Sequence, residues 1–193
     1  MEKNPSAFIA HNNLASVRSE QGRIDEAADH WAETVRLSPT CWEAWMGLGK
    51  LYRDTFRYPE SIRCFQRAFE LRPGSPEARY GLGTVYARMG RWAEAREQLE
   101  DALKERPHEA KVRFWLGEIA GQQGRIHDAI QQYLDAIQEE PRMADAYLAL
   151  GRLRSQRGET DRAANCYKTA LRLHPGHADA EAALARLQAA TER

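Results

Sequence analysis

Leucine followed by a very small residue recurs along the chain at a fixed interval of 34 positions. The leucines are Leu14, Leu48, Leu82, Leu116, Leu150 and Leu184, and the small residues are Ala15, Gly49, Gly83, Gly117, Gly151 and Ala185. Small residues let the backbones of packed helices approach closely. We therefore expect a closely packed helix at this point of each interval.

A second apolar pattern begins twelve residues after each of the first five of these small residues. In it a small residue is followed four positions later by a large one, and this spacing places both on one face of a helix. The small members are Ala27, Ser61, Ala95, Ala129 and Ala163, and the large ones are Trp31, Phe65, Leu99, Tyr133 and Tyr167. Each interval thus predicts two antiparallel helices, with large side chains of one covering small residues of the other.

Proline and glycine mark the turns between these helices. Six of the eight prolines stand 34 residues apart, at Pro5, Pro39, Pro73, Pro107, Pro141 and Pro175. Helices cannot run through proline, because its ring removes an N–H donor and clashes with the preceding turn. The turns inside the hairpins hold Gly22, Gly90, Gly124 and Gly158, which suit the left-handed residue that ends a helix. In the second hairpin Phe56 replaces this glycine and Pro59 follows, so we expect a turn of different shape there.

The pattern predicts five hairpins and one additional helix. The hairpins occupy residues 8–41, 42–75, 76–109, 110–143 and 144–177, and a polar capping helix follows at residues 178–190. One hairpin is not stable alone, because burial of each large side chain contributes only roughly 1.5–3 kcal/mol. This contribution is opposed by the loss of conformational entropy when the hairpin becomes ordered. Stacked hairpins bury their apolar faces together. We expect an all-α solenoid that forms a single domain over residues 1–193.

Composition excludes several classes of protein. The 28 Lys and Arg residues balance the 28 Asp and Glu residues, so no net charge attracts nucleic acid or an anionic membrane. We see no signal peptide and no apolar run long enough to span a membrane. Cys41, Cys64 and Cys166 are too few and too widely spaced for a disulfide framework or a thiolate metal site. A reducing cytoplasm fits these features best.

No motif in the sequence indicates catalysis. The stretch ending in Lys50 reads GLGK but has Ala44 in place of the first glycine of a phosphate loop, and Leu51 in place of its hydroxyl residue. His174 and His177 flank a turn, and zinc takes three or four protein ligands. No pair of carboxylates stands in an apolar setting suited to acid–base chemistry. We expect no enzyme activity, no cofactor and no metal.

The recurring positions resemble the tetratricopeptide repeat. The second unit carries Trp45, Leu48, Gly49, Tyr52, Ser61, Phe65, Ala68 and Pro73 in the pattern of that family, and the third carries Leu82, Gly83, Tyr86, Gly90, Ala95, Leu99, Ala102 and Pro107. The likeness runs from about Phe8 to the end of the chain. The chain resembles bacterial-type members of the family, and it also resembles tetratricopeptide domains within longer chains. The resemblance implies a right-handed, non-catalytic scaffold for protein recognition. Pentatricopeptide RNA readers use 35-residue units and are usually basic, so they fit less well.

The resemblance also implies that the first helix of each unit lines a concave groove. Carried over to this sequence, the candidate peptide-binding residues are Asn12, Met46, Lys50, Arg53, Tyr80, Arg88, Lys111, Phe114, Trp115, Leu148 and Arg152. Packing of Met46 and Leu148 against neighbouring helices is an open alternative. Phe114 and Trp115 are adjacent, so at least one should face outward or into the groove. The carboxylate clamp and the asparagine ladder known from the family are absent or nearly so.

We interpret the chain as a module that binds an apolar-anchored peptide or partner helix in its groove, with the basic residues favouring acidic flanks. Alternatives are a structural or oligomerisation module that uses its end faces, or the non-catalytic part of a larger enzyme. Ala10 and Val17, with Phe8 and Ile9, should meet a preceding unit and would otherwise face water. Pro5 is in phase with the later prolines, which suggests either the C-terminal part of a longer array or a homodimer through the N-terminal face.

Overall fold

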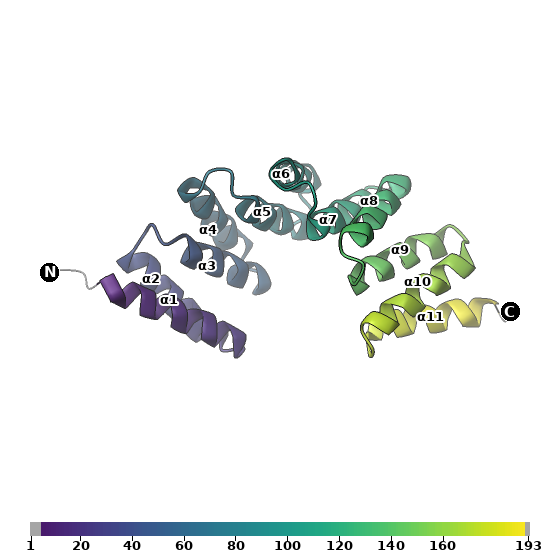
Figure 1. The fold of residues 1–193 in the computed structure, drawn as a ribbon, viewed down its shortest axis with the longest axis horizontal. Coiled ribbons are helices and arrows are strands. Elements are labelled where there is room, and N and C mark those ends of the chain that lie inside the picture. Colours follow the sequence, from purple (N-terminus) through teal and green to yellow (C-terminus); the bar gives the residue numbers. More distant parts are fainter. Residues whose placement is uncertain (1–4, 192–193) are drawn as a thin grey trace. The chain divides into compact units, whose positions relative to one another are not determined.

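The structure is a computed structural model that describes residues 5–191, and within that range every regular element is an α-helix (Figure 1). The helices are α1 (Pro5–Glu20), α2 (Ile24–Leu37), α3 (Trp42–Asp54), α4 (Tyr58–Leu71), α5 (Pro76–Arg88), α6 (Trp92–Glu105), α7 (Ala110–Gln122), α8 (Ile126–Glu139), α9 (Ala144–Gln156), α10 (Thr160–Leu173) and α11 (Ala178–Thr191). The predicted all-α class is confirmed. No described helix combines the length and the apolar character needed to cross a membrane.

The helices form two compact units, residues 1–105 and residues 106–193. In the first unit α1, α3 and α5 each pack against the helix that follows, and α2 and α4 pack against the next hairpin (Figure 1). The second unit repeats this scheme with α7 to α10, and α11 packs on α10 and α9. The hairpins therefore stack within each unit as expected. The single domain and its repeat boundaries stay predictions.

The predicted fit of large side chains over glycines is visible at Phe65. Phe65 is fully buried, and its ring lies beside Gly49 of its own hairpin and Gly81 of the next one. A Cβ atom would come within 2.7 Å of this ring at Gly49 and within 2.6 Å at Gly81. The Ser61 hydroxyl donates a buried hydrogen bond of 2.6 Å to the carbonyl oxygen of Gly49. One aromatic ring thus joins two hairpins, since only glycine leaves it room on both sides.

Our expectation for the turn at Phe56 is wrong. Phe56 has φ 60°, close to the 73° of Gly22, Gly90 and Gly124. The amide of Arg57 donates to the Tyr52 carbonyl across 2.7 Å, as the equivalent amide does at the glycine turns. A Cβ added at Gly22 or Gly124 meets no atom within 4 Å, so a side chain fits there and only the backbone is strained. The Phe56 side chain accordingly projects into solvent, with 71% of its surface exposed.

Replacement of Phe56 by glycine should stabilise the protein. A left-handed conformation costs a residue with a Cβ roughly 1–2 kcal/mol, and the entropy of glycine returns about half of this, so we expect a gain of about 0.5–1 kcal/mol. Urea denaturation measures it. The reverse change Gly90→Ala, in the equivalent turn, should cost about 1 kcal/mol. A Phe56→Gly variant less stable than the wild type would contradict the strain at this turn.

The first helix begins earlier than expected. Helix α1 starts at Pro5, whereas the five other in-phase prolines lie outside helices, in the turns between hairpins. Proline is compatible with the first turn of a helix, because its missing N–H would have no helical partner there. Pro5 therefore begins a helix in this structure and does not end one.

Candidate binding surfaces

The first unit contains a pocket over the ring of Trp31. It has a volume of about 390 Å³ and is lined by Ser16, Ser19, Glu20, Trp31, Trp42, Glu43, Met46, Gly47, Lys50 and Glu77. The Trp31 ring packs directly against Gly47, where a Cβ atom would lie 2.4 Å from Cε2 of the ring, so only glycine fits at this position. The pocket therefore has an aromatic floor that the sequence analysis did not place in the groove.

A second pocket of about 320 Å³ adjoins the first. The two share Ser19, Trp31, Gly47 and Lys50, and the second adds Ile24, Leu51, Arg53, Asp54 and Thr55. Three predicted groove residues, Met46, Lys50 and Arg53, thus lie around one hollow. The structure brings them together through α3, with Trp31 of α2 beneath.

Charges in the first unit largely balance each other. The Asp54 carboxylate accepts a hydrogen bond of 2.9 Å from Arg53 and lies 3.9 Å from the guanidinium of Arg88. Lys50 is exposed and shares its pocket with carboxylates of Glu20 and Glu43. The predicted preference for acidic partners stays a prediction, and carboxylates of the chain itself lie beside these basic residues.

The apolar groove residues differ in exposure. Met46 and Leu148 are each only 5% exposed and belong to buried clusters, with Phe65 and Tyr167 respectively. This arrangement matches the alternative that they pack against neighbouring helices. Asn12 and Tyr80 are half-buried and Lys111 is exposed. Whether any of them binds a ligand stays a prediction.

Phe114 and Trp115 form an aromatic pair in the second unit. Their ring centroids are 6.3 Å apart in an edge-to-face arrangement, and both side chains are half-buried. The centroid of the Phe114 ring also lies 5.8 Å from that of Tyr133. Phe114 packs against two buried clusters, which include Tyr133 and Ala136 respectively. Tyr133 is buried and donates a hydrogen bond of 2.6 Å to Glu118. Burial raises the pKa of Tyr133, and the Glu118 carboxylate raises it further.

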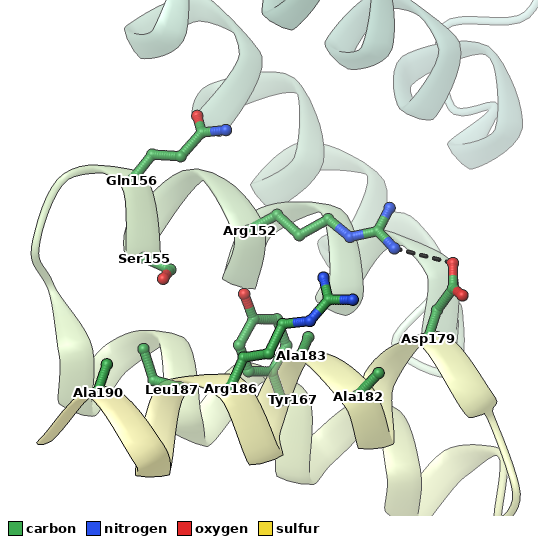
Figure 2. A pocket seen from close by; sticks show the side chains of 10 residues that line it. All are labelled: Arg152, Ser155, Gln156, Tyr167, Asp179, Ala182, Ala183, Arg186, Leu187 and Ala190. Carbon is green, nitrogen blue, oxygen red and sulfur yellow. Dashed lines mark hydrogen bonds and ion pairs between the residues drawn. The ribbon is translucent and has the colours of Figure 1, made fainter. Parts of the chain in front are cut away.

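The second unit has its own pocket, between α9 and α11 (Figure 2). Its volume is about 400 Å³, and it is lined by Arg152, Ser155, Gln156, Tyr167, Asp179, Ala182, Ala183, Arg186, Leu187 and Ala190. Arg152 donates a hydrogen bond of 2.8 Å to the Asp179 carboxylate. The buried Tyr167 supplies the floor. Burial raises the pKa of Tyr167, and Ser155 and Arg152 act in the opposite direction.

The residues of α11 in this pocket were missed by the sequence analysis, although a signal for them was present. We carried the groove positions over to five units only. The same positions in the partial sixth unit are Asp179, Ala182, Ala183, Arg186 and Ala190, and all of them line the pocket. The expectation of a polar capping helix at residues 178–190 assigned no binding role to them.

Other reactive groups are not assembled into a site. Burial raises the pKa of the Cys64 thiol to about 12, and it also raises the pKa values of the Cys41 and Cys166 thiols. All three cysteines are free and buried. His11 and His30 face each other across 2.9 Å between their Nδ1 atoms. In the described part of the chain, no group of three or more His, Cys, Asp or Glu side chains could hold a metal ion.

Comparisons with known families give one consistent result. Four family models described as tetratricopeptide repeat match residues 9–33, 43–104, 80–146 and 120–187. These matches together span most of the chain. No curated protein matches the sequence.

Solved structures with similar folds come from the same family. YrrB, a TPR protein with an unusual peptide-binding site, is 22% identical with a TM-score of 0.65, over 94% of each chain. TTC0263 of Thermus thermophilus, a thermophilic TPR protein, is 19% identical with a TM-score of 0.80, over 94% of this chain and 99% of its own. PilF of Pseudomonas aeruginosa is 16% identical with a TM-score of 0.83, over 97% of this chain and 85% of its own. At these identities the likeness shows the fold.

Proposed function

Because the chain belongs to the tetratricopeptide repeat family, we propose that it is a protein–protein interaction scaffold that binds a peptide or partner helix along the first helices of its hairpins. This fold typically mediates protein–protein interaction, and its members are generally non-catalytic scaffolds. On the same grounds we infer that the chain is not an enzyme and binds no nucleic acid. Its free cysteines suit the cytoplasm.

One observation carries the proposal. The pockets of about 320, 390 and 400 Å³ all take walls from the first helices of hairpins, or from α11, which occupies the same place in the pattern. Each combines an apolar or aromatic floor with charged residues at its rim. Concave sites of this kind suit peptide side chains that anchor in a pocket while polar groups fix their orientation.

Loss of the aromatic pair should weaken recognition. We expect a peptide selected on the intact chain from a displayed library to bind the Phe114→Ala, Trp115→Ala double variant more weakly by roughly 2 kcal/mol, as for loss of a hot spot. Fluorescence anisotropy measures this, and circular dichroism checks the fold. Trp115→Ala alone is the safer variant, because Phe114 also packs in the core.

Leu134→Ala is the matched control for this experiment. Leu134 lies on α8, a second helix of a hairpin, and is 38% exposed. The control should leave affinity unchanged. If the well-folded Trp115→Ala variant and the double variant both bind the peptide with unaltered affinity, the contact lies on another surface. That result would contradict the proposal that this part of the groove binds the peptide.

A second candidate function is self-association through the face of α1. Leu14 is 42% exposed and Val17 is 46% exposed, whereas Leu48 and Val85, at the equivalent positions of later hairpins, are 3% and 0% exposed. Residues 5–17 contain no Asp, Glu, Lys or Arg, so like charges would not oppose pairing of two copies. Ile9 adds to the exposed apolar surface at 50%. These features support a homodimer in which this face is covered.

A single carboxylate in this face should separate the copies. If the homodimer forms, Val17→Glu should shift the mass measured by light scattering from dimer to monomer, because burial of an unpaired carboxylate is strongly unfavourable. Gln122→Glu adds the same charge at an exposed position of α7 and should leave the dimer intact. A wild-type protein that is monomeric at high micromolar concentration would contradict this candidate.

A further inference from the structure

Arg186 on α11 is a cation without a carboxylate partner. Within residues 5–191 the structure gives it no ion pair or hydrogen bond, and it is exposed at the wall of the pocket between α9 and α11. Figure 2 shows the guanidinium groups of Arg186 and Arg152 extending toward the same side of this pocket. Two guanidinium groups that line one pocket are suited to one carboxylate or to two neighbouring ones.

The second arginine already holds a carboxylate from the chain itself. Arg152 pairs with Asp179 across 2.8 Å, and their side chains are 52% and 67% exposed (Figure 2). Ion pairs exposed to this degree contribute little stability, so a carboxylate from another molecule can replace Asp179. Asp179 therefore marks where an acidic group sits and acts as its internal competitor.

The rest of the pocket suits the remainder of an acidic peptide. The hydroxyl groups of Tyr167 and Ser155 are neutral and offer hydrogen bonds without repelling an anion. The α11 wall is otherwise apolar, and its residues are Ala182, Ala183, Leu187 and Ala190. Methylene groups and small apolar side chains of a peptide can pack against this wall, which is exposed at Ala182 and Ala190.

The contrast with the first unit gives the site its specificity. In the pocket over Trp31, Lys50 lies with three glutamates, Glu20, Glu43 and Glu77, so that pocket has no excess of positive charge. In the α9–α11 pocket two arginines face one aspartate, and displacement of that aspartate leaves both arginines available. Electrostatic complementarity therefore favours anionic partners in the α9–α11 pocket over the pocket on Trp31.

We infer that the pocket between α9 and α11 binds an acidic segment of a partner peptide, in which one carboxylate displaces Asp179 from Arg152 and pairs with Arg152 and Arg186. The inference rests on the proposed function, because it names the chemistry of the peptide that one part of the groove takes. Helix α11 then contributes to recognition as well as covering α10.

Two labelled peptides test this inference on the full chain. One alternates glutamate with leucine, and the other replaces each glutamate by glutamine. We expect the glutamate peptide to bind at least several-fold more tightly, with a preference that falls as salt rises. Arg186→Gln and Arg152→Gln should each weaken it about two- to fivefold, as for exposed ion pairs. Asp179→Asn should tighten it, since the competing carboxylate is gone.

Arg172→Gln provides the matched control. Arg172 is exposed on α10 outside the pocket, and its loss changes the net charge equally. A general effect of charge would weaken binding as much in this variant as in Arg186→Gln, and that result would overturn the inference. Equal affinity for the two peptides, or binding of neither, would overturn it as well. Loss of peptide binding in Trp115→Ala, with all pocket variants unchanged, would overturn the inference and leave the proposed function standing.

Discussion

Replacement of Phe65 by alanine is expected to lower the free energy of unfolding by about 3–5 kcal/mol, the largest loss of any single change proposed for this protein. Phe65 is fully buried, and its ring fills the space left by two glycines, Gly49 and Gly81. Neither glycine has a side chain that could move into the cavity. Helices α3, α4 and α5 would all lose contacts, because the ring lies between two hairpins.

Urea denaturation followed by tryptophan fluorescence measures this loss. Four of the five tryptophans, Trp31, Trp42, Trp45 and Trp92, lie in residues 1–105, so the signal reports mainly the unit that holds Phe65. Phe56→Ala is the matched control, since Phe56 is 71% exposed and its removal should change stability by less than about 0.5 kcal/mol. Similar losses in the two variants would contradict the packing described for Phe65.

The fold could be predicted because packing itself produces the recurring pattern. Phe65 recurs as Trp31, Leu99, Tyr133 and Tyr167, and each of these needs a small residue opposite it. Glycine is the smallest solution, and it appears at Gly83 and Gly117, where a Cβ would lie 2.6 Å from Leu99 and Tyr133. A spacing that encodes such contacts therefore indicates the hairpin directly.

The groove could be predicted only in outline. Its positions follow from the turn of each first helix, but their exposure depends on what the next helix places beside them. Met46 is covered because Phe65 and its neighbours pack there, and the sequence pattern does not contain that distance. The pattern predicts only a packing role for Trp31, yet this residue, although 7% exposed, also lines two pockets.

The turn at Phe56 shows a different limit. Sequence preference indicates glycine for a left-handed residue, and its absence predicted another turn. The surrounding helices impose the same turn on phenylalanine, since α3 and α4 must still pack as a hairpin. Tertiary packing here outweighs local preference, at a backbone cost of roughly 1–2 kcal/mol.

The second large effect is expected at Gly117, in the hairpin of α7 and α8. Gly117→Leu should lower the free energy of unfolding by about 1–3 kcal/mol or more, through overpacking. A Cβ at this position would lie 2.6 Å from Cε1 of Tyr133. The ring cannot move away easily, since its hydroxyl donates a hydrogen bond to Glu118 and its centroid lies 5.8 Å from that of the Phe114 ring. Trp115, the one tryptophan in residues 106–193, reports the unfolding of this unit by fluorescence.

Gly121, one turn later on the same helix, gives the matched control. A Cβ there would meet its nearest neighbour, the Cβ of Ala129, at an ordinary contact distance of 3.9 Å. Gly121→Ala should therefore stabilise the helix by about 0.5–1 kcal/mol, whereas Gly117→Ala should destabilise the hairpin despite the same gain in helix propensity. Tyr133→Ala should remove most of the cost of Gly117→Leu, so that the two losses are far from additive. Additive losses, or equal effects of alanine at the two glycines, would show that Tyr133 does not press on Gly117.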